Sequence, residues 1–408
     1  MTSTNGMSDP LSRFGLTPVI NASGTMTTLG ASRVATEVRE AVDAILQRFV
    51  IIDELHAAAS GIIARATGAE AGYVTSSSAS AIALASAAAI TGDDLAAIEA
   101  LPDAGGRERR VAVMTSHMVN YGGPLPQAIA ASGAAVVPLG TAALCETYHL
   151  EAAIRAGLAA AVYVVSHHTV REGELPLPLF IEICRAQGVP VIVDMAAEYD
   201  LRGPVVLGAD AVIWSGHKFL GGPTSGIVAG RAAMIRAMVL QNRGLGRLMK
   251  AGKEAVAGAL AALEAWARRD HAAEVEREGR IVDAWIEALS GEPGLALARH
   301  GDWTGNPVVR AEIRVDPALA GLHAWELAER CLVGTPAVAL RDDLSMHQLL
   351  YLDPCNVTAG EAAIVAERIR AVCSTARARG DGLKRDWVAE KRARGQAPTP
   401  WLDRASHG

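Results

Sequence analysis

Two stretches of the sequence decide the expected fold: Val191-Ile-Val-Asp-Met-Ala-Ala-Glu198 and Ile213-Trp-Ser-Gly-His-Lys-Phe-Leu-Gly-Gly-Pro-Thr-Ser-Gly226. Residues 191–193 are wholly apolar, which is typical of a short strand buried inside a parallel sheet. Asp194 follows this strand. Ligands of open α/β sheets bind at the carboxyl edge, where such a side chain emerges. The second stretch begins as a similar strand and leads Lys218 into a turn rich in glycine and proline.

An acid at one strand end and a lysine at the next suit a pyridoxal phosphate (PLP) site. Lys218 would hold the cofactor as a Schiff base, and Asp194 would keep the pyridine nitrogen protonated so that the ring acts as an electron sink. Taken alone, each residue is better explained as a strand-terminal aspartate or a solvated loop lysine. Their combination with the turn that follows favours the cofactor site.

The string Ser-Gly-His-Lys with Gly-Gly-Pro behind it resembles the lysine loop of fold-type I PLP enzymes. More narrowly, it resembles the selenocysteine synthase-like group that includes D-glucosaminate-6-phosphate ammonia-lyase. The upstream Asp-x-Ala-Ala-Glu, Asn21-Ala-Ser-Gly-Thr-Met-Thr-Thr-Leu-Gly30 and residues 55–75 also fit, so the likeness runs from about Leu16 to Ile369. It implies an α/β fold with a mainly parallel, seven-stranded type of sheet, helices on both faces and a smaller α+β C-terminal domain.

Length and composition bound the organisation of the chain. A chain of 408 residues is too long for one small hydrophobic core, so we expect a large and a smaller domain. Only 4% of the residues are aromatic, which predicts a core of alanine, valine, leucine and isoleucine. The net charge of −6 argues against a nucleic-acid partner. The expected parts are an N-terminal arm (1–30), a large PLP-binding domain (31–255), a small C-terminal domain (256–380) and a loose tail (381–408).

Cysteine usage and hydropathy favour a cytoplasmic protein without a membrane segment. The cysteines are odd in number and form no Cys-x-x-Cys pair, so we expect small buried thiols in a reducing compartment. No uncharged apolar run reaches the ~18 residues of a membrane helix, and residues 1–9 lack a signal pattern. The cysteines are Cys145, Cys184, Cys331, Cys355 and Cys373.

Strand and helix patterns alternate between residues 71 and 215, as in a parallel sheet. Farther along, residues 255–289 read as one long helical region, and residues 348–352 read as the hairpin partner of a strand at 338–340. We expect strands at 71–74, 111–114, 134–137, 161–165 and 307–315, and helices at 36–50, 53–67, 179–187, 231–240, 324–331 and 360–375.

Hydroxyl residues open the long helix after the strand at 71–74. Backbone N–H groups and hydroxyls at a helix N-terminus form a phosphate site, although one serine suffices as an ordinary helix cap. The resemblance favours the first interpretation, because this turn grips the cofactor phosphate in fold-type I enzymes. The candidates are Ser76, Ser77 and Ser78.

The resemblance also assigns roles around the cofactor. His117 follows a strand at the point where a side chain stacks on the ring, but it is equally well explained as a loop histidine with a hydrogen-bonded ring. Selenocysteine synthases typically have Ser-Arg-Gly-Glu there, which this sequence lacks. Ala196 would lie under the ring. Ser215 and His217 would bind the phosphate.

His167 and His168 are adjacent, and on an extended segment they would point to opposite faces, which disfavours a shared metal. We expect no metal, and we favour His168 slightly as the histidine that reaches the cofactor's phenolic oxygen or the substrate. A basic stretch at 241–253 would either attract an anionic substrate or lie solvated as a surface loop.

Arg341 ends the strand expected at 338–340, where fold-type I enzymes often place the arginine that binds the substrate α-carboxylate. A solvated strand-end arginine is the alternative. Asn21 and Thr25 lie in the N-terminal segment, which in the resembled group approaches the cofactor of the partner subunit. Otherwise they are turn formers.

The expected reaction is α,β-elimination by a PLP-dependent lyase. An ammonia-lyase or dehydratase of this kind would convert a small hydroxylated amino acid or amino sugar acid into a 2-oxo acid and ammonia. Racemisation, aldol cleavage and transamination use the same groups and stay open. Seryl-tRNA transfer is less expected, because the chain is acidic and enters the family's core almost at once. The partners expected are a small-molecule amino acid and a second copy of the chain, in a homodimer or a higher oligomer.

Overall fold

The computed structural model describes residues 9–396, which form two compact units. Unit 2 comprises Gly30–Arg269, and unit 1 combines the chain before it with the chain after it. The N-terminal segment belongs to unit 1 because β1 (Val19–Ala22) pairs in parallel with β11 (Ala337–Leu340). The boundary lies past the expected residue 255, because α11 (Lys253–Arg268) packs on helices of unit 2.

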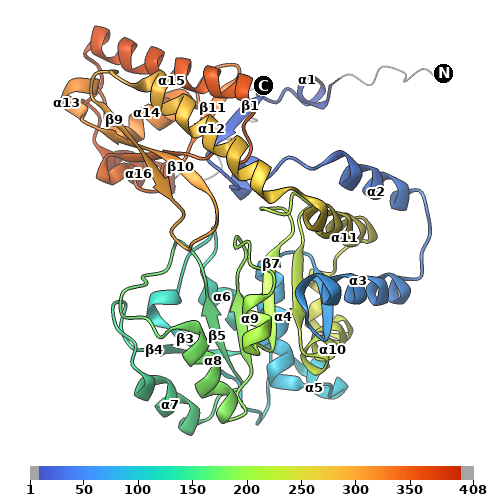
Figure 1. Cartoon of the computed structure of the whole chain (residues 1–408). Helices are drawn as coiled ribbons and strands as arrows, with labels where there is room; N and C mark the ends of the chain where they lie inside the picture. The colour runs from blue at the N-terminus through green and yellow to red at the C-terminus, as the bar shows by residue number, and fades with distance from the viewer. Residues whose placement is uncertain (1–8, 397–408) are drawn as a thin grey trace, which may run out of the picture. The chain divides into compact units, whose positions relative to one another are not determined.

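Unit 2 is built on a seven-stranded sheet of order β2-β8-β7-β6-β5-β3-β4, as expected from the sequence (Figure 1). Only β8 runs antiparallel to its neighbours, β2 and β7, while the remaining pairs are parallel. The strands are β2 (Ala71–Thr75), β3 (Arg110–Met114), β4 (Ala135–Leu139), β5 (Ala160–Val164), β6 (Val191–Asp194), β7 (Ala211–Ser215) and β8 (Gly226–Gly230).

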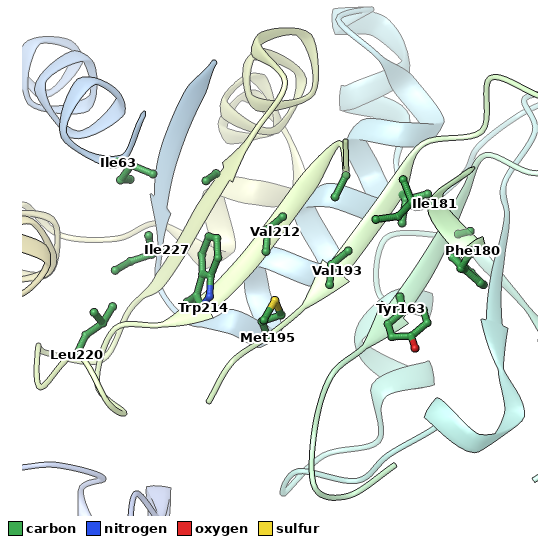
Figure 2. Packing of buried hydrophobic residues seen from close by; sticks show 14 of the residues in the cluster. Ile63, Tyr163, Phe180, Ile181, Val193, Met195, Val212, Trp214, Leu220 and Ile227 are labelled. Carbon is green, nitrogen blue, oxygen red and sulfur yellow. The ribbon is translucent and has the colours of Figure 1, made fainter. Parts of the chain in front are cut away.

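Helices cover both faces of this sheet, so its central strands are apolar on both sides. Along β7, Val212 and Trp214 enter one core while Ala211 and Ile213 enter the other, which is the two-residue alternation of a strand. Figure 2 shows the first of these cores. Besides α11, the helices are α2 (Thr36–Leu46), α3 (Ile52–Thr67), α4 (Ser78–Thr91), α5 (Leu95–Ala100), α6 (Leu125–Ala130), α7 (Thr147–Ala156), α8 (Leu177–Ala186), α9 (Gly203–Leu207) and α10 (Ala232–Leu240), with 3-10 turns η2 (Thr115–His117), η3 (Gln241–Arg243) and η4 (Leu245–Met249).

Unit 1 is the expected α+β part. Its main sheet is antiparallel, of order β12-β10-β9. The strands of that sheet are β9 (Leu295–Gly301), β10 (Val309–Val315) and β12 (Leu349–Leu352), and the helices are α1 (Pro10–Phe14), α12 (His271–Leu289), α13 (Pro317–Ala320), α14 (Ala324–Cys331), α15 (Ala359–Arg379) and α16 (Trp387–Gln396), with 3-10 turns η1 (Thr27–Leu29) and η5 (Ser345–His347).

Three local predictions in this part of the chain are wrong. β12 pairs with β10 and meets the β11 segment only at the Arg341–Tyr351 bridge, because β1 takes the place beside β11. The region 255–289 is two helices, because Asp270 caps α12 by accepting the N–H of Ala273. The expected loose tail contains α16, which begins near an ion pair of Arg385 with Glu329.

Residues 1–8 and 397–408, which complete the expected arm and tail, lie outside the described residues. None of the helices between residues 9 and 396 combines the length and the apolar character that a membrane crossing requires. All five cysteines are free thiols, and four of them are buried. The expectation of small buried thiols therefore holds for every position except Cys355, which is partly exposed.

A buried charge cluster organises unit 1. Arg310 lies between two carboxylates, with Nε 2.7 Å from Asp353 Oδ2 and Nη1 2.7 Å from Asp302 Oδ1. Burial is the largest influence on Asp353 and by itself would raise the pKa, but the Arg310 charge, the hydrogen bonds from Cys355 and the Arg341 charge together hold that pKa below its ordinary value. Glu278 on α12 is compensated less fully, although Arg277 Nη2 lies 3.5 Å from its Oε1. Burial, reinforced by the Asp353 charge, raises its pKa to about 7.

Glu278→Gln should stabilise the protein at about pH 8. The pKa of Glu278 lies above its unfolded value, so its contribution is fully present below the unfolded pKa and is lost as pH rises through about 7. A neutral amide avoids that loss, and we expect a gain on the order of 1–3 kcal/mol in urea unfolding at about pH 8 that shrinks at about pH 5. Glu276→Gln, at a 72% exposed side chain of the same helix, is the control. An equal effect of both variants at both pH values would contradict this account.

Candidate active site

The sheet topology brings the predicted site residues to one edge of unit 2. Thr75, the last residue of β2, and Ser215, the last residue of β7, both pair with Gly226, the first residue of β8. Asp194 ends β6 opposite Ile213 of β7. The segments that follow β2, β6 and β7 therefore start from the same edge, as Figure 1 allows the reader to follow.

Asp194 is a buried carboxylate at this edge, only 4% exposed. Its Oδ1 accepts the N–H of Ala196 at 3.2 Å, which fixes its orientation. Burial raises the pKa of Asp194 to about 6, and the positive charge of Lys218 together with the Ala196 N–H holds it from rising further. The acid and the lysine are therefore electrostatically coupled, and the acid stays largely ionised at neutral pH.

The backbone around Lys218 is held from three sides. Its carbonyl accepts the hydroxyl of Ser32 at 2.7 Å and the N–H of Gly221 at 3.0 Å, while its own N–H donates to Ser215 at 3.4 Å. Ser32 follows Ala31, a buried residue with φ of 63°, a conformation that disfavours a side chain. The sequence analysis missed this support, since nothing in the short string Gly30-Ala-Ser32 indicates a contact 186 positions away.

His217 offers an unused ring nitrogen beside Lys218. Its Nδ1 lies 3.1 Å from the hydroxyl of Ser215, which is fully buried. Its Nε2 is buried and forms no hydrogen bond within residues 9–396. Burial, followed by the Lys218 charge, lowers the pKa of His217, so the ring is neutral at physiological pH. A buried polar atom without a partner is rare in proteins, and it fits a polar group of a bound ligand.

The serine turn after β2 serves first as a helix cap. Ser77 Oγ accepts the N–H of Ser80, and Ser80 Oγ accepts the N–H of Ser77, which closes a capping box at the start of α4. The Ser76 hydroxyl donates to Ser80 Oγ at 3.1 Å. The Ser78 hydroxyl forms no hydrogen bond with another described residue, so it and the helix N-terminus suit an anion best.

His117 is held by hydrogen bonds at both ring nitrogens. It is fully buried, with Nε2 2.9 Å from Glu174 Oε2 and Nδ1 accepting the N–H of Val164 at 3.1 Å. The ring of Tyr163 packs against it nearly at a right angle, with 4.5 Å between ring centroids. No face of the ring is open to a cofactor, so the structure agrees with the hydrogen-bonded loop histidine, which the sequence also allowed.

His167 and His168 lie in a turn, and their ring centroids are 3.8 Å apart. The expectation that they point to opposite faces is wrong, because the segment after β5 is not extended. His168 is exposed, but it stands at the site edge, since Val165 donates its N–H to the carbonyl of Asp194 at 2.9 Å. Among the described residues, no group of three His, Cys, Asp or Glu side chains is arranged to hold a metal ion.

Tyr121 also joins this edge and was missed by the sequence analysis. It follows β3, and the charge of Asp194 acts on its phenol. An aromatic residue in a loop carries no pattern that would identify it as a site residue. The predicted basic stretch, in contrast, lies elsewhere: Gln241 bonds to Thr91 at the end of α4 remote from the serine turn.

The remaining candidates belong to unit 1. Asn21 closes a turn, donating to the carbonyl of Gly24 at 2.8 Å and accepting the N–H of Ser23 at 2.9 Å, which is the turn-forming role. Thr25 follows it, partly buried. Arg341 is 7% exposed, lies 4.7 Å over the ring of Trp303 and donates from Nε to Asp343.

Comparison with known proteins places the chain among PLP enzymes of this architecture. The family model of L-seryl-tRNA selenium transferase (SelA) matches residues 19–282. The D-glucosaminate-6-phosphate ammonia lyase of Salmonella typhimurium is 38% identical over 89% of this chain and 98% of its own length. The 5'-C-glycyluridine monooxygenase-decarboxylase of a Streptomyces species is 36% identical over 86% of this chain and 89% of its own length.

Solved structures agree. The structure of D-glucosaminate-6-phosphate ammonia-lyase matches with a TM-score of 0.82 at 37% identity, covering 91% of this chain and all of that one. Aspartate aminotransferase from Thermus thermophilus matches with a TM-score of 0.53 at 16% identity, over 89% and 94% of the two chains. The second likeness concerns the fold alone.

Gly226→Ala should destabilise unit 2 at the site edge. A Cβ at Gly226 would overlap the carbonyl of Ser77 and the hydroxyl of Thr75, so β8 and the serine turn would have to separate. We expect a loss of about 1–3 kcal/mol in chemical unfolding. Gly360→Ala is the matched control, because its Cβ meets nothing within 4 Å and α15 gains a better helix former. Unchanged unfolding of the Gly226 variant would refute the close packing described here.

Proposed function

Because this chain belongs to the L-seryl-tRNA selenium transferase (SelA) family, we propose that it is a PLP-dependent lyase. It catalyses α,β-elimination on a small hydroxylated amino acid or amino sugar acid, giving a 2-oxo acid and ammonia. The observation that carries this proposal is the buried Asp194 carboxylate, coupled to Lys218 at the carboxyl edge of the sheet. The extensive similarity to an ammonia lyase supports the reaction.

PLP supplies, when bound, an electron sink for negative charge on the substrate Cα. The residues present fit this group. Asp194 would hold the proton at the pyridine nitrogen, and the orientation of its carboxylate is set by the Ala196 N–H. The unused Nε2 of His217 and the Ser78 hydroxyl, with the N-terminus of α4, suit the phosphate. Ala196 leaves room under the ring.

Lys218 first anchors the cofactor and is then the base. Its amine, once free of the cofactor, would remove the proton from Cα. The bond between Cβ and its oxygen then breaks, and the oxygen leaves as water after taking up a proton. The unsaturated amine that is released hydrolyses to the 2-oxo acid and ammonia. In this scheme His168, which is exposed at the same edge, contacts the substrate.

A second reaction class follows from the comparisons. The monooxygenase-decarboxylase is nearly as similar to this chain as the ammonia lyase. Racemisation, aldol cleavage and transamination require the same lysine and acid. Seryl-tRNA transfer is disfavoured, because the chain is acidic and the Moorella thermoacetica selenium transferase is only 26% identical over 58% of its length.

We also propose a homodimer or higher oligomer in the cytoplasm. A run of exposed apolar side chains between α2 and α3 supports self-association, with Phe49 fully exposed and Ile51 62% exposed. Lys253 holds this run in place by donating to the carbonyls of Leu46 and Arg48. The five free cysteines support a reducing compartment.

The purified protein should be yellow and should carry PLP on Lys218. Borohydride reduction should fix the cofactor to the wild-type chain and not to Lys218→Ala, as measured by peptide mass. Lys391→Ala, which removes a lysine of α16 in unit 1, should still be labelled. A colourless protein that does not take up added PLP would end the proposal.

A substrate panel separates the reaction classes. With 3-hydroxy amino acids and amino sugar acids, a lyase releases ammonia and 2-oxo acid in equal amounts and consumes no oxygen. Oxygen uptake with carbon dioxide release would favour the monooxygenase-decarboxylase reaction, and inversion without ammonia would favour a racemase. A shift of tRNA in a gel would favour the transferase.

Arg341→Lys should raise the KM for substrate about tenfold or more with little change in kcat. We propose that the guanidinium binds the substrate carboxylate through Nη1 and Nη2, which donate no hydrogen bond to other residues between 9 and 396, and lysine cannot replace that fork. Steady-state kinetics with Arg314→Lys, whose side chain is 66% exposed, provide the control. An unchanged KM would leave Arg341 with a structural role only.

A further inference from the structure

The hydroxyl of Tyr121, like Nε2 of His217, is a buried polar atom that has no hydrogen-bond partner among the described residues. The side chain is partly buried and packs against the core that contains α4 and β3. Its Oη is buried, yet it forms no hydrogen bond within the described part of the chain. Leaving a buried hydroxyl unsatisfied is costly, so such a group indicates a partner that the protein itself does not supply.

The loop that carries Tyr121 is closed by its own hydrogen bonds. Asn120 Oδ1 accepts the N–H of Gly122 at 3.0 Å, and Tyr121 donates its N–H to Gly123 at 3.3 Å. Asn120 and Pro124 form an isolated bridge, and Leu125 donates to Val119 at 3.0 Å. These bonds fix the backbone on both sides of Tyr121.

The surroundings of Tyr121 keep its phenol protonated, so that the hydroxyl can donate a hydrogen bond. Burial and then the negative charge of Asp194 raise the pKa of Tyr121 to about 12, so the phenol is protonated at any physiological pH. The hydroxyl has no hydrogen bond to Asp194, although the carboxylate is near enough to act on it. A neutral phenol offers its proton, so an acceptor that is bound at this edge of the sheet would complete its hydrogen bonding.

We propose that Tyr121 is a further catalytic residue, whose hydroxyl donates a hydrogen bond to the phenolic oxygen of PLP. The inference rests on the proposed cofactor. Of the polar groups on that ring, the nitrogen belongs to Asp194, the aldehyde carbon to Lys218 and the phosphate to the serine turn. The phenolic oxygen is the acceptor that remains. A buried, pinned donor suits it better than the exposed His168, which the sequence had favoured for this contact.

Tyr121→Phe tests this, because the substitution should keep or raise the stability of the cofactor-free protein and should weaken the binding of PLP. Without PLP, the variant should melt at or above the wild-type temperature, because it no longer buries an unsatisfied hydroxyl. With PLP, it should bind about tenfold more weakly in an absorbance titration. The pH midpoint of the bound cofactor's colour change should move upward, because the phenolic oxygen loses a donor that favours its anionic form. Tyr148→Phe, at a 59% exposed tyrosine, should change none of these values.

Each outcome has a distinct meaning. If wild-type protein binds PLP and Tyr121→Phe matches it in affinity and colour midpoint, this inference fails while the proposed function stands. If the cofactor-free variant melts well below wild type, the hydroxyl has a structural partner and the inference fails as well. If wild-type protein does not bind PLP, the proposed function fails and this inference falls with it.

Discussion

One electrostatic constraint underlies the site: a carboxylate that is almost fully buried stays charged only beside a positive charge. Burial pushes the pKa of Asp194 upward, and Lys218 together with the Ala196 N–H holds it near 6. The sheet makes this pairing possible, because β6 and β7 are neighbours and both end at one edge. A protonated pyridine nitrogen would be a second cation against the same carboxylate. The ionised carboxylate of Asp194 would therefore be stabilised both by Lys218 and by the protonated cofactor.

Close backbone packing keeps these groups in place. Gly226 starts β8 directly against the Ser77 carbonyl, where no side chain fits, and a side chain at Gly216, in front of Lys218, would have to displace the Ser225 hydroxyl. Ser32 fastens the carbonyl of Lys218 from a distant part of unit 2. The lysine loop is thus fixed by its main chain, as the proposed double role of Lys218, anchoring a cofactor and moving a proton, would require.

The sequence predicted what local patterns encode. Apolar strands that end in Asp194 and Ser215, the glycine-rich turn and the hydroxyl-rich start of α4 are each readable within a dozen residues, and the sheet built from them was confirmed. What failed depends on pairing across the chain. β1 displaces β12 beside β11, and Glu174 and Val164 engage both nitrogens of His117. Tyr121 could not be found either, since its significance comes from Asp194, which lies far away in sequence.

The pair Asp194 and Lys218 does not by itself select a reaction. Two relatives, an ammonia lyase and a monooxygenase-decarboxylase, differ by only 2 percentage points in identity to this chain (38 − 36) and carry different reactions in their names. Such a pair promotes the withdrawal of negative charge from the substrate Cα into the cofactor ring. What happens next depends on which donors surround the ring and the leaving group and on whether oxygen has access. The residues that distinguish these outcomes must therefore be sought around the pair, among side chains such as Tyr121 and His168, and not in the lysine loop.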